Sequence, residues 1–256
     1  GIIPGLLLAA LFSLYCLIEA ALAGRADKPA WAGWPTVWSA VRRSIWALMA
    51  PPVVMGGIYF GVFTATEAAA AGAIYALLVA VLVYRNFGLA DLWACAYSTM
   101  RTTMMVFMII AAAAMFGYAI TIIRLPVGVT EAVAQMDLGP LGFIIAVMAL
   151  IFVLGMFLES IAIILITTPI LLPTLHTLGI DLIWYGVLLM INLELAMITP
   201  PVGMNLFAIK GITGAPLSEI VKGAAPYVAI MIIGMAILIA FPELATWLPF
   251  RAGFGR

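Results

Sequence analysis

Long apolar stretches, separated by short segments rich in glycine, proline or charge, make up most of this 256-residue chain. A transmembrane helix needs about 20 predominantly apolar residues. By this measure the predicted spans or membrane-inserted segments are residues 3–23, 50–84, 102–123, 141–175, 182–210 and 225–248. The pattern therefore predicts an all-α polytopic membrane protein.

The stretch at residues 50–84 is about twice as long as one span requires. Three glycines between residues 56 and 61 offer a place to divide it. Thr64 and Glu67 then match the Thr-x-x-Glu capping box, in which two side chains satisfy free N–H groups at a helix start. We expect an alanine-rich helix to open at Ala68.

Three further segments mix polar residues with apolar ones at helical spacing. Residues 35–49 and 90–101 predict amphipathic helices that lie along the membrane interface. Residues 127–135 predict a short amphipathic connector after a stop at Arg124-Leu125-Pro126. The last span is expected to close at Phe241-Pro242 and Trp247-Leu248-Pro249.

Composition restricts the class of protein. Apolar residues make up 66% of the chain and charged residues 9%, with a mean hydropathy of +1.25; a soluble domain carries roughly 25% charged residues. Zero net charge and the lack of a basic stripe argue against a nucleic-acid partner. With one histidine, His176, and aspartates only in loops or at helix ends, the chain also lacks the residue sets of intramembrane proteases. We expect no enzyme and no metal site beyond sodium.

Two of the apolar segments are interrupted by residues that favour turns, at Gly155–Ser160 and at Ile198–Gly203. Lipid cannot satisfy the backbone groups that such a break exposes, so breaks persist only where protein or a wet cavity surrounds them. Paired breaks mark the substrate and ion site of many transporters. Residues 141–175 predict a re-entrant hairpin, because its two arms are short; two ordinary helices joined by a tight turn are the alternative.

The second break has a direct chemical consequence. Pro200 and Pro201 remove two N–H donors, and Gly203 permits an unusual turn. We expect this to leave the carbonyls of residues 196–199 unpaired, so that they and the Thr199 hydroxyl offer oxygen ligands to Na⁺. The helix starts near Ser160 and Met204 would present N–H groups to an anion. A prolyl kink without any ligand is the alternative.

Three carboxylates fall within apolar segments, where ionisable groups are costly and often functional. Glu67 has a structural explanation as the partner in the capping box. Glu159, beside Ser160 at the first break, could either face a cation or cap the following helix. Glu194 could face the groove or pair with Asn192 or Asn205.

Several motifs, taken in order, resemble the large membrane subunit of tripartite ATP-independent periplasmic (TRAP) transporters. They are Gly61-Val-Phe-Thr-Ala-Thr-Glu-Ala-Ala-Ala, Gly155-Met-Phe-Leu-Glu, Pro169-Ile-Leu-Leu-Pro, Gly179-Ile-Asp, Thr199-Pro-Pro-Val-Gly and the closing Phe241-Pro and Trp247-Leu-Pro. The resemblance runs from residue 1 to about residue 249 and is to the C-terminal one of two inverted repeats. Because the chain opens at Gly1 without Met or a charged leader, we expect a fragment or a processed form.

The resemblance implies a sodium-coupled elevator transporter in the bacterial inner membrane, with Na⁺ as the coupling ion. Residues 1–138 would form scaffold helices with interfacial arms, residues 139–211 the moving transport region, and residues 212–256 a C-terminal arm and scaffold helix. A periplasmic binding protein would deliver an organic acid, and a small membrane subunit would brace the scaffold. The positive charges at Arg25, Lys28, Arg42 and Arg43 would place their loop in the cytoplasm.

Carried over by motif, the resemblance implies sodium ligands from backbone or hydroxyl oxygens of Gly155, Ala196, Thr199 and Val202. Further candidates for the substrate and ion groove are Glu159, Ser160, Pro200, Pro201, Gly203 and Asn205. Ala196 stands where the family commonly has glycine, and Glu159 where it usually has an acidic residue. Two alternatives stay open: a stand-alone sodium/carboxylate carrier of similar architecture, and a membrane scaffold subunit that transports nothing.

Overall fold

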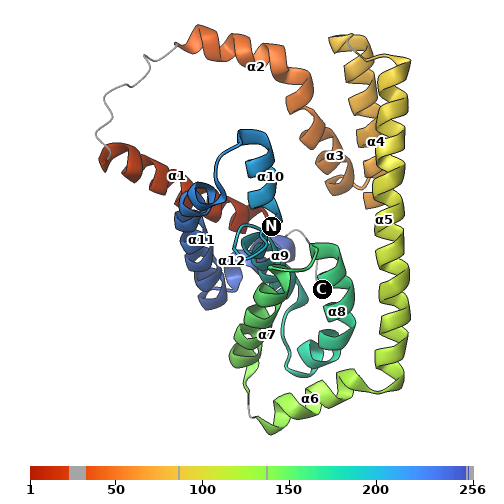
Figure 1. The fold of residues 1–256 in the computed structure, drawn as a ribbon, viewed down its shortest axis with the longest axis vertical. Helices are drawn as coiled ribbons and strands as arrows, with labels where there is room; N and C mark the ends of the chain where they lie inside the picture. Colours follow the sequence, from red (N-terminus) through yellow and green to blue (C-terminus); the bar gives the residue numbers. More distant parts are fainter. Residues whose placement is uncertain (23–32, 86, 137, 252, 254–256) are drawn as a thin grey trace. The chain divides into compact units, whose positions relative to one another are not determined.

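The computed structural model describes residues 1–22, 33–85, 87–136, 138–251 and 253, and every regular element within these ranges is helical (Figure 1). The chain packs as two compact units, residues 1–24 with 105–256, and residues 25–104. This division describes packing; the predicted division into scaffold and transport regions concerns movement and stays a prediction. The two units are described in turn.

The smaller unit contains α2 (Trp34–Leu48), α3 (Ala50–Tyr59), α4 (Ala65–Leu78), the π-helical turn Val79–Tyr84 and the first part of α5 (Leu89–Ile122). The Tyr75 hydroxyl on α4 donates to the Trp46 carbonyl on α2 at 2.6 Å. The helix predicted at residues 35–49 and the division of residues 50–84 are both confirmed, although α4 opens three residues earlier than predicted. Arg25 and Lys28 of the predicted basic cluster lie outside the described residues.

The capping box at the start of α4 has the predicted geometry. The Thr64 N–H donates to Glu67 Oε2 at 2.8 Å, and the Glu67 N–H donates to Thr64 Oγ1 at 3.3 Å. The Thr64 hydroxyl also donates to the same carboxylate oxygen at 2.8 Å. Glu67 therefore has the structural role that its spacing indicates.

The larger unit contains α1 (Ile2–Leu22), the second part of α5, and all later helices. These are α6 (Leu125–Gln135), α7 (Pro140–Gly155), α8 (Ser160–Thr177), α9 (Leu182–Met197), α10 (Met204–Thr213), α11 (Leu217–Ala240) and α12 (Glu243–Arg251). Its core forms where α7 packs on α9 and α8 packs on α6, with α11 against α9 and α1 (Figure 1). The Trp184 indole N–H on α9 donates to the Leu238 carbonyl on α11 at 2.8 Å.

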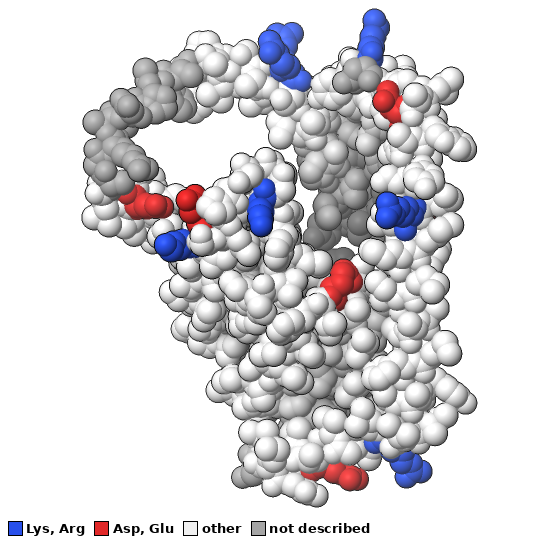
Figure 2. All heavy atoms as spheres, in the orientation of Figure 1, with Lys and Arg blue, Asp and Glu red and all other residues white. Residues whose placement is uncertain are grey.

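Within the described part of the chain, five helical segments are long and apolar enough to cross a membrane: Ile2–Leu22, Ala65–Tyr84, Leu89–Ile122, Ser160–Thr177 and Leu217–Ala240. Two shorter apolar helices, α7 and α9, accompany them. Large apolar side chains are exposed along many of these helices, as a lipid-facing surface requires. Figure 2 shows that the visible face carries only scattered charges on a broad uncharged surface. The predicted all-α polytopic fold is confirmed.

Two predicted boundaries are wrong. Helix α5 runs unbroken for 34 residues, whereas the sequence predicted an interfacial helix ending at Arg101 and a separate span from Thr102. Helix α11 begins at Leu217, before the predicted residue 225, and ends at Ala240, and the residues after Pro242 form the separate helix α12. Helix α8, whose arm of the hairpin was predicted to end at residue 175, continues through Pro169 and Pro173 to Thr177. Polarity changes and isolated prolines therefore did not end these helices.

Candidate functional site

The first break separates α7 from α8 by four residues, 156–159. The last turn of α7 closes with hydrogen bonds from Met156 N–H to the Phe152 carbonyl (3.2 Å) and from Leu158 N–H to the Leu154 carbonyl (2.9 Å). No N–H or hydroxyl among the described residues donates to the Gly155 carbonyl. The carbonyl oxygen predicted as a ligand is thus without an internal partner. Whether the two arms enter and leave on the same side of a membrane stays a prediction.

Glu159 caps α8. Its Oε2 accepts from the Ile161 N–H at 2.8 Å and from the Ala162 N–H at 3.2 Å. This confirms the capping role, one of the two alternatives that the sequence left open. The cap also satisfies two of the N–H groups with which the start of α8 would otherwise bind an anion.

The second break follows a tightened last turn of α9. The Ile198 and Thr199 N–H groups donate to the Leu195 and Ala196 carbonyls at 3.3 and 3.1 Å. The Thr199 hydroxyl donates to the Leu195 carbonyl at 2.6 Å. The prediction that all carbonyls of residues 196–199 are unpaired is therefore wrong for Ala196, because a tight turn captures it. Among the described residues, no group donates to the carbonyls of residues 197–199.

Gly203 opens α10 from a left-handed conformation, with φ of 48°. A Cβ atom added there would lie 3.0 Å from the Thr199 carbonyl oxygen and 2.9 Å from Leu206 Cδ1. Glycine is needed at this position both for the backbone angle and for space. No side chain caps α10. The Leu206 N–H donates to the Gly203 carbonyl at 2.8 Å, whereas no described group accepts from the N–H groups of Met204 and Asn205.

The two breaks meet in the structure. A Cβ atom added at Gly155 would lie only 2.6 Å from the Ala196 Cβ, so the end of α7 touches the end of α9 directly. The Ser160 hydroxyl, at the start of α8, donates to the Met197 sulfur at 3.3 Å. Gly155 and Ala196 are both buried. Two segments about 40 residues apart in sequence therefore form one contact, with unpaired carbonyls on both sides of it.

The remaining predicted residues lie nearby in sequence but are not drawn into this contact by any hydrogen bond among the described residues. Pro200, Pro201 and Val202 form the exposed turn between α9 and α10, and Asn205 is half-buried in the first turn of α10. Glu194 is exposed and does not pair with Asn192.

Sequence reasoning did not name Met197, and it named Asn192 only as a possible partner of Glu194. Met197 accepts the hydrogen bond of Ser160, and Asn192 is completely buried between α9 and α7. Nothing in the sequence distinguishes Met197 from its apolar neighbours. The bond of Asn192 could have been predicted from the sequence, since an amide within an apolar membrane helix often forms a hydrogen bond to a neighbouring helix.

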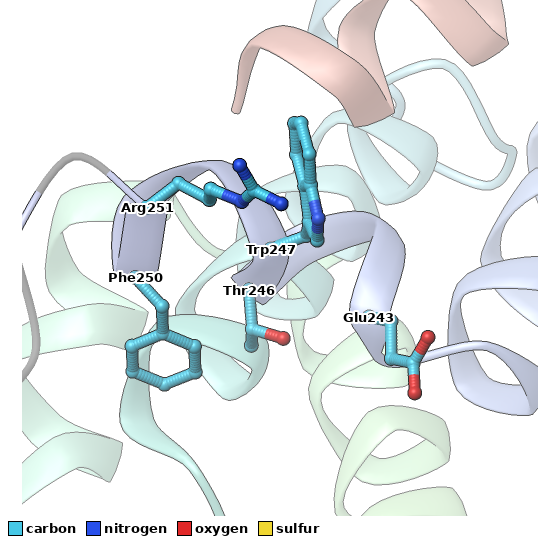
Figure 3. Close-up of a pocket in the computed structure, with 5 residues that line it drawn as sticks. All are labelled: Glu243, Thr246, Trp247, Phe250 and Arg251. Carbon is cyan, nitrogen blue, oxygen red and sulfur yellow. The ribbon is translucent and has the colours of Figure 1, made fainter.

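A separate pocket of about 590 Å³ lies on α12. It is lined by Glu243, Thr246, Trp247, Phe250 and Arg251 (Figure 3). The Arg251 guanidinium carbon lies 5.2 Å from the centre of the Trp247 ring, and Figure 3 shows the two side chains next to each other. Paired Trp and Arg side chains at the end of an apolar region are typical of membrane–water interfaces.

Comparisons with known proteins identify the family of the chain. Residues 1–244 match the family model described as "Tripartite ATP-independent periplasmic transporter, DctM component". The chain is 36% identical over 248 residues to the ectoine TRAP transporter large permease protein TeaC of Halomonas elongata, covering 97% of this chain and 58% of the relative. It is 33% identical over 269 residues to the C4-dicarboxylate TRAP transporter large permease protein DctM of Vibrio cholerae, covering 97% and 59%.

A third relative, the 2,3-diketo-L-gulonate TRAP transporter large permease protein YiaN of Escherichia coli, is 33% identical over 246 residues, covering 95% of this chain and 57% of the relative. The chain thus spans somewhat more than half the length of these proteins. All three relatives are named transporter permease proteins, which agrees with the expectation of a non-enzyme. Together with its apolar helices, the matches identify the chain as a multi-pass protein of the bacterial inner membrane that belongs to the DctM family of TRAP transporter large permease subunits.

Proposed function

We propose that this chain forms the part of a TRAP large permease in which sodium binding is coupled to the transport of an organic acid. The observation that carries the proposal is the contact of the two breaks at Gly155 and Ala196, with unpaired carbonyl oxygens in both segments. Backbone carbonyl oxygens without internal partners, held together by two helix ends, suit a hard monovalent cation.

The proposed sodium ligands are oxygens of Gly155, Ala196, Thr199 and Val202. The Thr199 hydroxyl donates a hydrogen bond to the Leu195 carbonyl, so the lone pairs of its oxygen are free to face a cation. The Ala196 carbonyl accepts from a backbone N–H but keeps a second lone pair. A bound Na⁺ would fix the tip of the hairpin against the end of α9 and complete the adjoining groove.

The substrate carboxylate is proposed to bind at the start of α10. Helix N-termini attract anions through free N–H groups and the helix dipole. The start of α8 is already capped by Glu159, whereas α10 has no side-chain cap. Gly203 and Asn205 would therefore contact the anion, with Ser160, Pro200 and Pro201 shaping the groove. The names of the relatives contain ectoine, C4-dicarboxylate and 2,3-diketo-L-gulonate, and each of these compounds carries a carboxylate.

The proposed mechanism is of the elevator type, in which residues 139–211 move against the scaffold formed by residues 1–138 and 212–256. A small membrane subunit would brace that scaffold, and a periplasmic binding protein would deliver the organic acid. Since the chain spans somewhat more than half of its relatives, the remainder of such a subunit would contribute the other part of the groove.

The test is uptake of radiolabelled organic acids by the full-length subunit, reconstituted with its small membrane partner. Uptake is measured with and without an inward sodium gradient, and with and without the binding protein. Uptake that needs both supports the proposal. Uptake that needs sodium alone supports the stand-alone carrier, and the absence of any sodium effect overturns the coupling proposal and leaves the scaffold alternative.

The substitution Thr199→Ala sharpens this test. It removes one ligand oxygen and should raise the sodium concentration for half-maximal uptake about tenfold, which corresponds to about 1.4 kcal/mol. Thr177→Ala is the matched control, because the Thr177 hydroxyl also donates to a carbonyl four residues earlier but lies away from the break. An unchanged sodium response in Thr199→Ala would remove this residue from the site.

A further inference from the structure

Helix α7 has no polar side chain with which a hydrogen bond could fix its position along α9. Its residues, Pro140–Gly155, include no hydroxyl, amide or charged side chain. It packs on α9, and its buried side chains are all apolar: Phe143, Ile144, Val147, Met148 and Ile151. Apolar contacts are non-directional, and in a membrane lipid competes for them, so these contacts specify the register of such a pair only weakly.

One polar group crosses this interface. Asn192 of α9 is 0% exposed, and its Nδ2 donates to the Met148 carbonyl of α7 at 2.8 Å. Among the described residues, this is the only side-chain hydrogen bond between the two helices. The Asn192 Oδ1 is buried and accepts no hydrogen bond from any described residue. A buried acceptor without a partner destabilises the fold, so stability alone does not account for an amide here.

The position of the bond suggests what it does. Asn192 precedes Ala196 by four residues, one helical turn, and Met148 precedes Gly155 by seven, two turns. The hydrogen bond and the Gly155–Ala196 contact therefore lie along the same faces of the two helices. If α7 slipped along α9 by one turn, ~5.4 Å, Leu193 or Thr199 would replace Ala196 opposite Gly155. Both side chains are larger than that of Ala196, which already lies too close to Gly155 for a Cβ atom to fit there.

We propose that Asn192 is a positioning residue that sets the register of α7 against α9 and thereby holds the hairpin tip at Ala196. A single buried asparagine fixes register in coiled coils in the same manner, at a cost in stability. The amide of Asn192 acts through the backbone, because it donates to the Met148 carbonyl and to no other carbonyl of α7. The effect of this register on transport rests on the proposed function, whereas the role of Asn192 in setting the register does not.

Register is measured directly by cross-linking. In the full-length protein with Cys16 and Cys95 replaced by serine, the changes Ser160→Cys and Met197→Cys place thiols on two side chains that now contact each other, the hydroxyl and the sulfur being 3.3 Å apart. A short bifunctional thiol reagent should join them rapidly in membranes. Adding Asn192→Leu, which keeps the branched shape of the side chain but cannot donate, should slow this reaction at least fivefold. It should also allow a cross-link between Ser160→Cys and Leu193→Cys, one turn away.

The control is Tyr185→Phe. Tyr185 lies two turns before Asn192 on α9, and its hydroxyl is the other buried side-chain oxygen in the described structure without a partner. Its removal should leave the cross-linking rate and pattern unchanged. Thermal unfolding of Asn192→Leu should be close to that of the parent, since an unpaired acceptor is lost together with the hydrogen bond. If Asn192→Leu fails to fold, Asn192→Ala takes its place.

An unchanged cross-linking pattern in the Asn192 variant would overturn the inference, as would a lower unfolding temperature without any change of register. In transport assays the variant should need about fivefold more sodium, whereas Tyr185→Phe should not. A changed register with unchanged sodium dependence would support the role of Asn192 and contradict the sodium site. The two proposals can therefore fail separately.

Discussion

At the scale of single residues, the site depends on how closely two backbones approach. Gly155 and Ala196 carry the smallest side chains available, which lets the end of α7 touch the end of α9. Small residues at helix contacts are a common device in membranes, where close packing replaces the hydrophobic effect between helices. In this chain they bring unpaired carbonyl oxygens of two segments together.

The substitution Gly155→Ala tests this contact. Its new methyl group would lie 2.6 Å from the Ala196 Cβ, which is attached to backbone and cannot move aside. We expect a loss of about 1–3 kcal/mol in stability, as for other overpacked sites, together with weaker sodium dependence of uptake. The measurement is thermal unfolding in detergent alongside uptake.

Gly186→Ala is the control for that experiment. Gly186 is also a helical glycine, on α9, but a Cβ atom there would meet nothing within 4 Å. Its replacement should leave stability equal or higher, because alanine favours helix. Equal behaviour of the two variants would show that the tip does not pack as described.

The residues of the site could be predicted only in part. The breaks at Gly155–Ser160 and at Ile198–Gly203 follow from glycine and proline, whose effects on the backbone are local. The contact between Gly155 and Ala196 depends on how α7 and α9 pack, which no local pattern encodes. The capture of the Ala196 carbonyl by the Thr199 N–H likewise depends on the conformation of one turn.

At the scale of elements, helices begin where a cap is present and continue until a turn removes several bonds. Thr64 and Glu67 start α4 as the sequence predicted. Arg101 does not end α5, because a charged residue keeps its N–H and fits a helix well. Pro226 lies inside α11, ten residues after its N-cap Pro216, so it did not mark the start that the sequence suggested.

The capping box provides a prediction for one element. Thr64→Ala removes the acceptor for the Glu67 N–H and should destabilise the start of α4 by about 1 kcal/mol. Hydrogen exchange of the first-turn amides should become faster. Thr102→Ala, whose hydroxyl bonds to a carbonyl within α5, should leave those amides unchanged, and equal exchange in both variants would contradict the capping role.

At the scale of the whole molecule, the distribution of charge indicates its orientation. Charged side chains are few, and Arg42 and Arg43 lie together on α2, next to the predicted cytoplasmic loop. Segments rich in Arg and Lys remain on the cytoplasmic side of bacterial membranes. α2 should therefore face the cytoplasm.

Labelling of a single cysteine tests this orientation. In a protein without Cys16 and Cys95, Ser39→Cys places an exposed thiol on α2 close to the two arginines. A membrane-impermeant thiol reagent should label it only after the cells are permeabilised. Labelling in intact spheroplasts would reverse the orientation.

The two prolines inside α8 give the hairpin arms different mechanical properties. Pro169 and Pro173 lie four residues apart on the exposed side of α8, and each withholds one hydrogen bond from the helix. Ile163, Thr167, Leu171 and Thr174 fill its buried side. α7 has no interior proline and keeps its full ladder beyond the first turn. α7 is consequently the stiffer arm of the hairpin and α8 the more flexible one. A force on the tip would bend α8 at its prolines, while α7 would keep its shape.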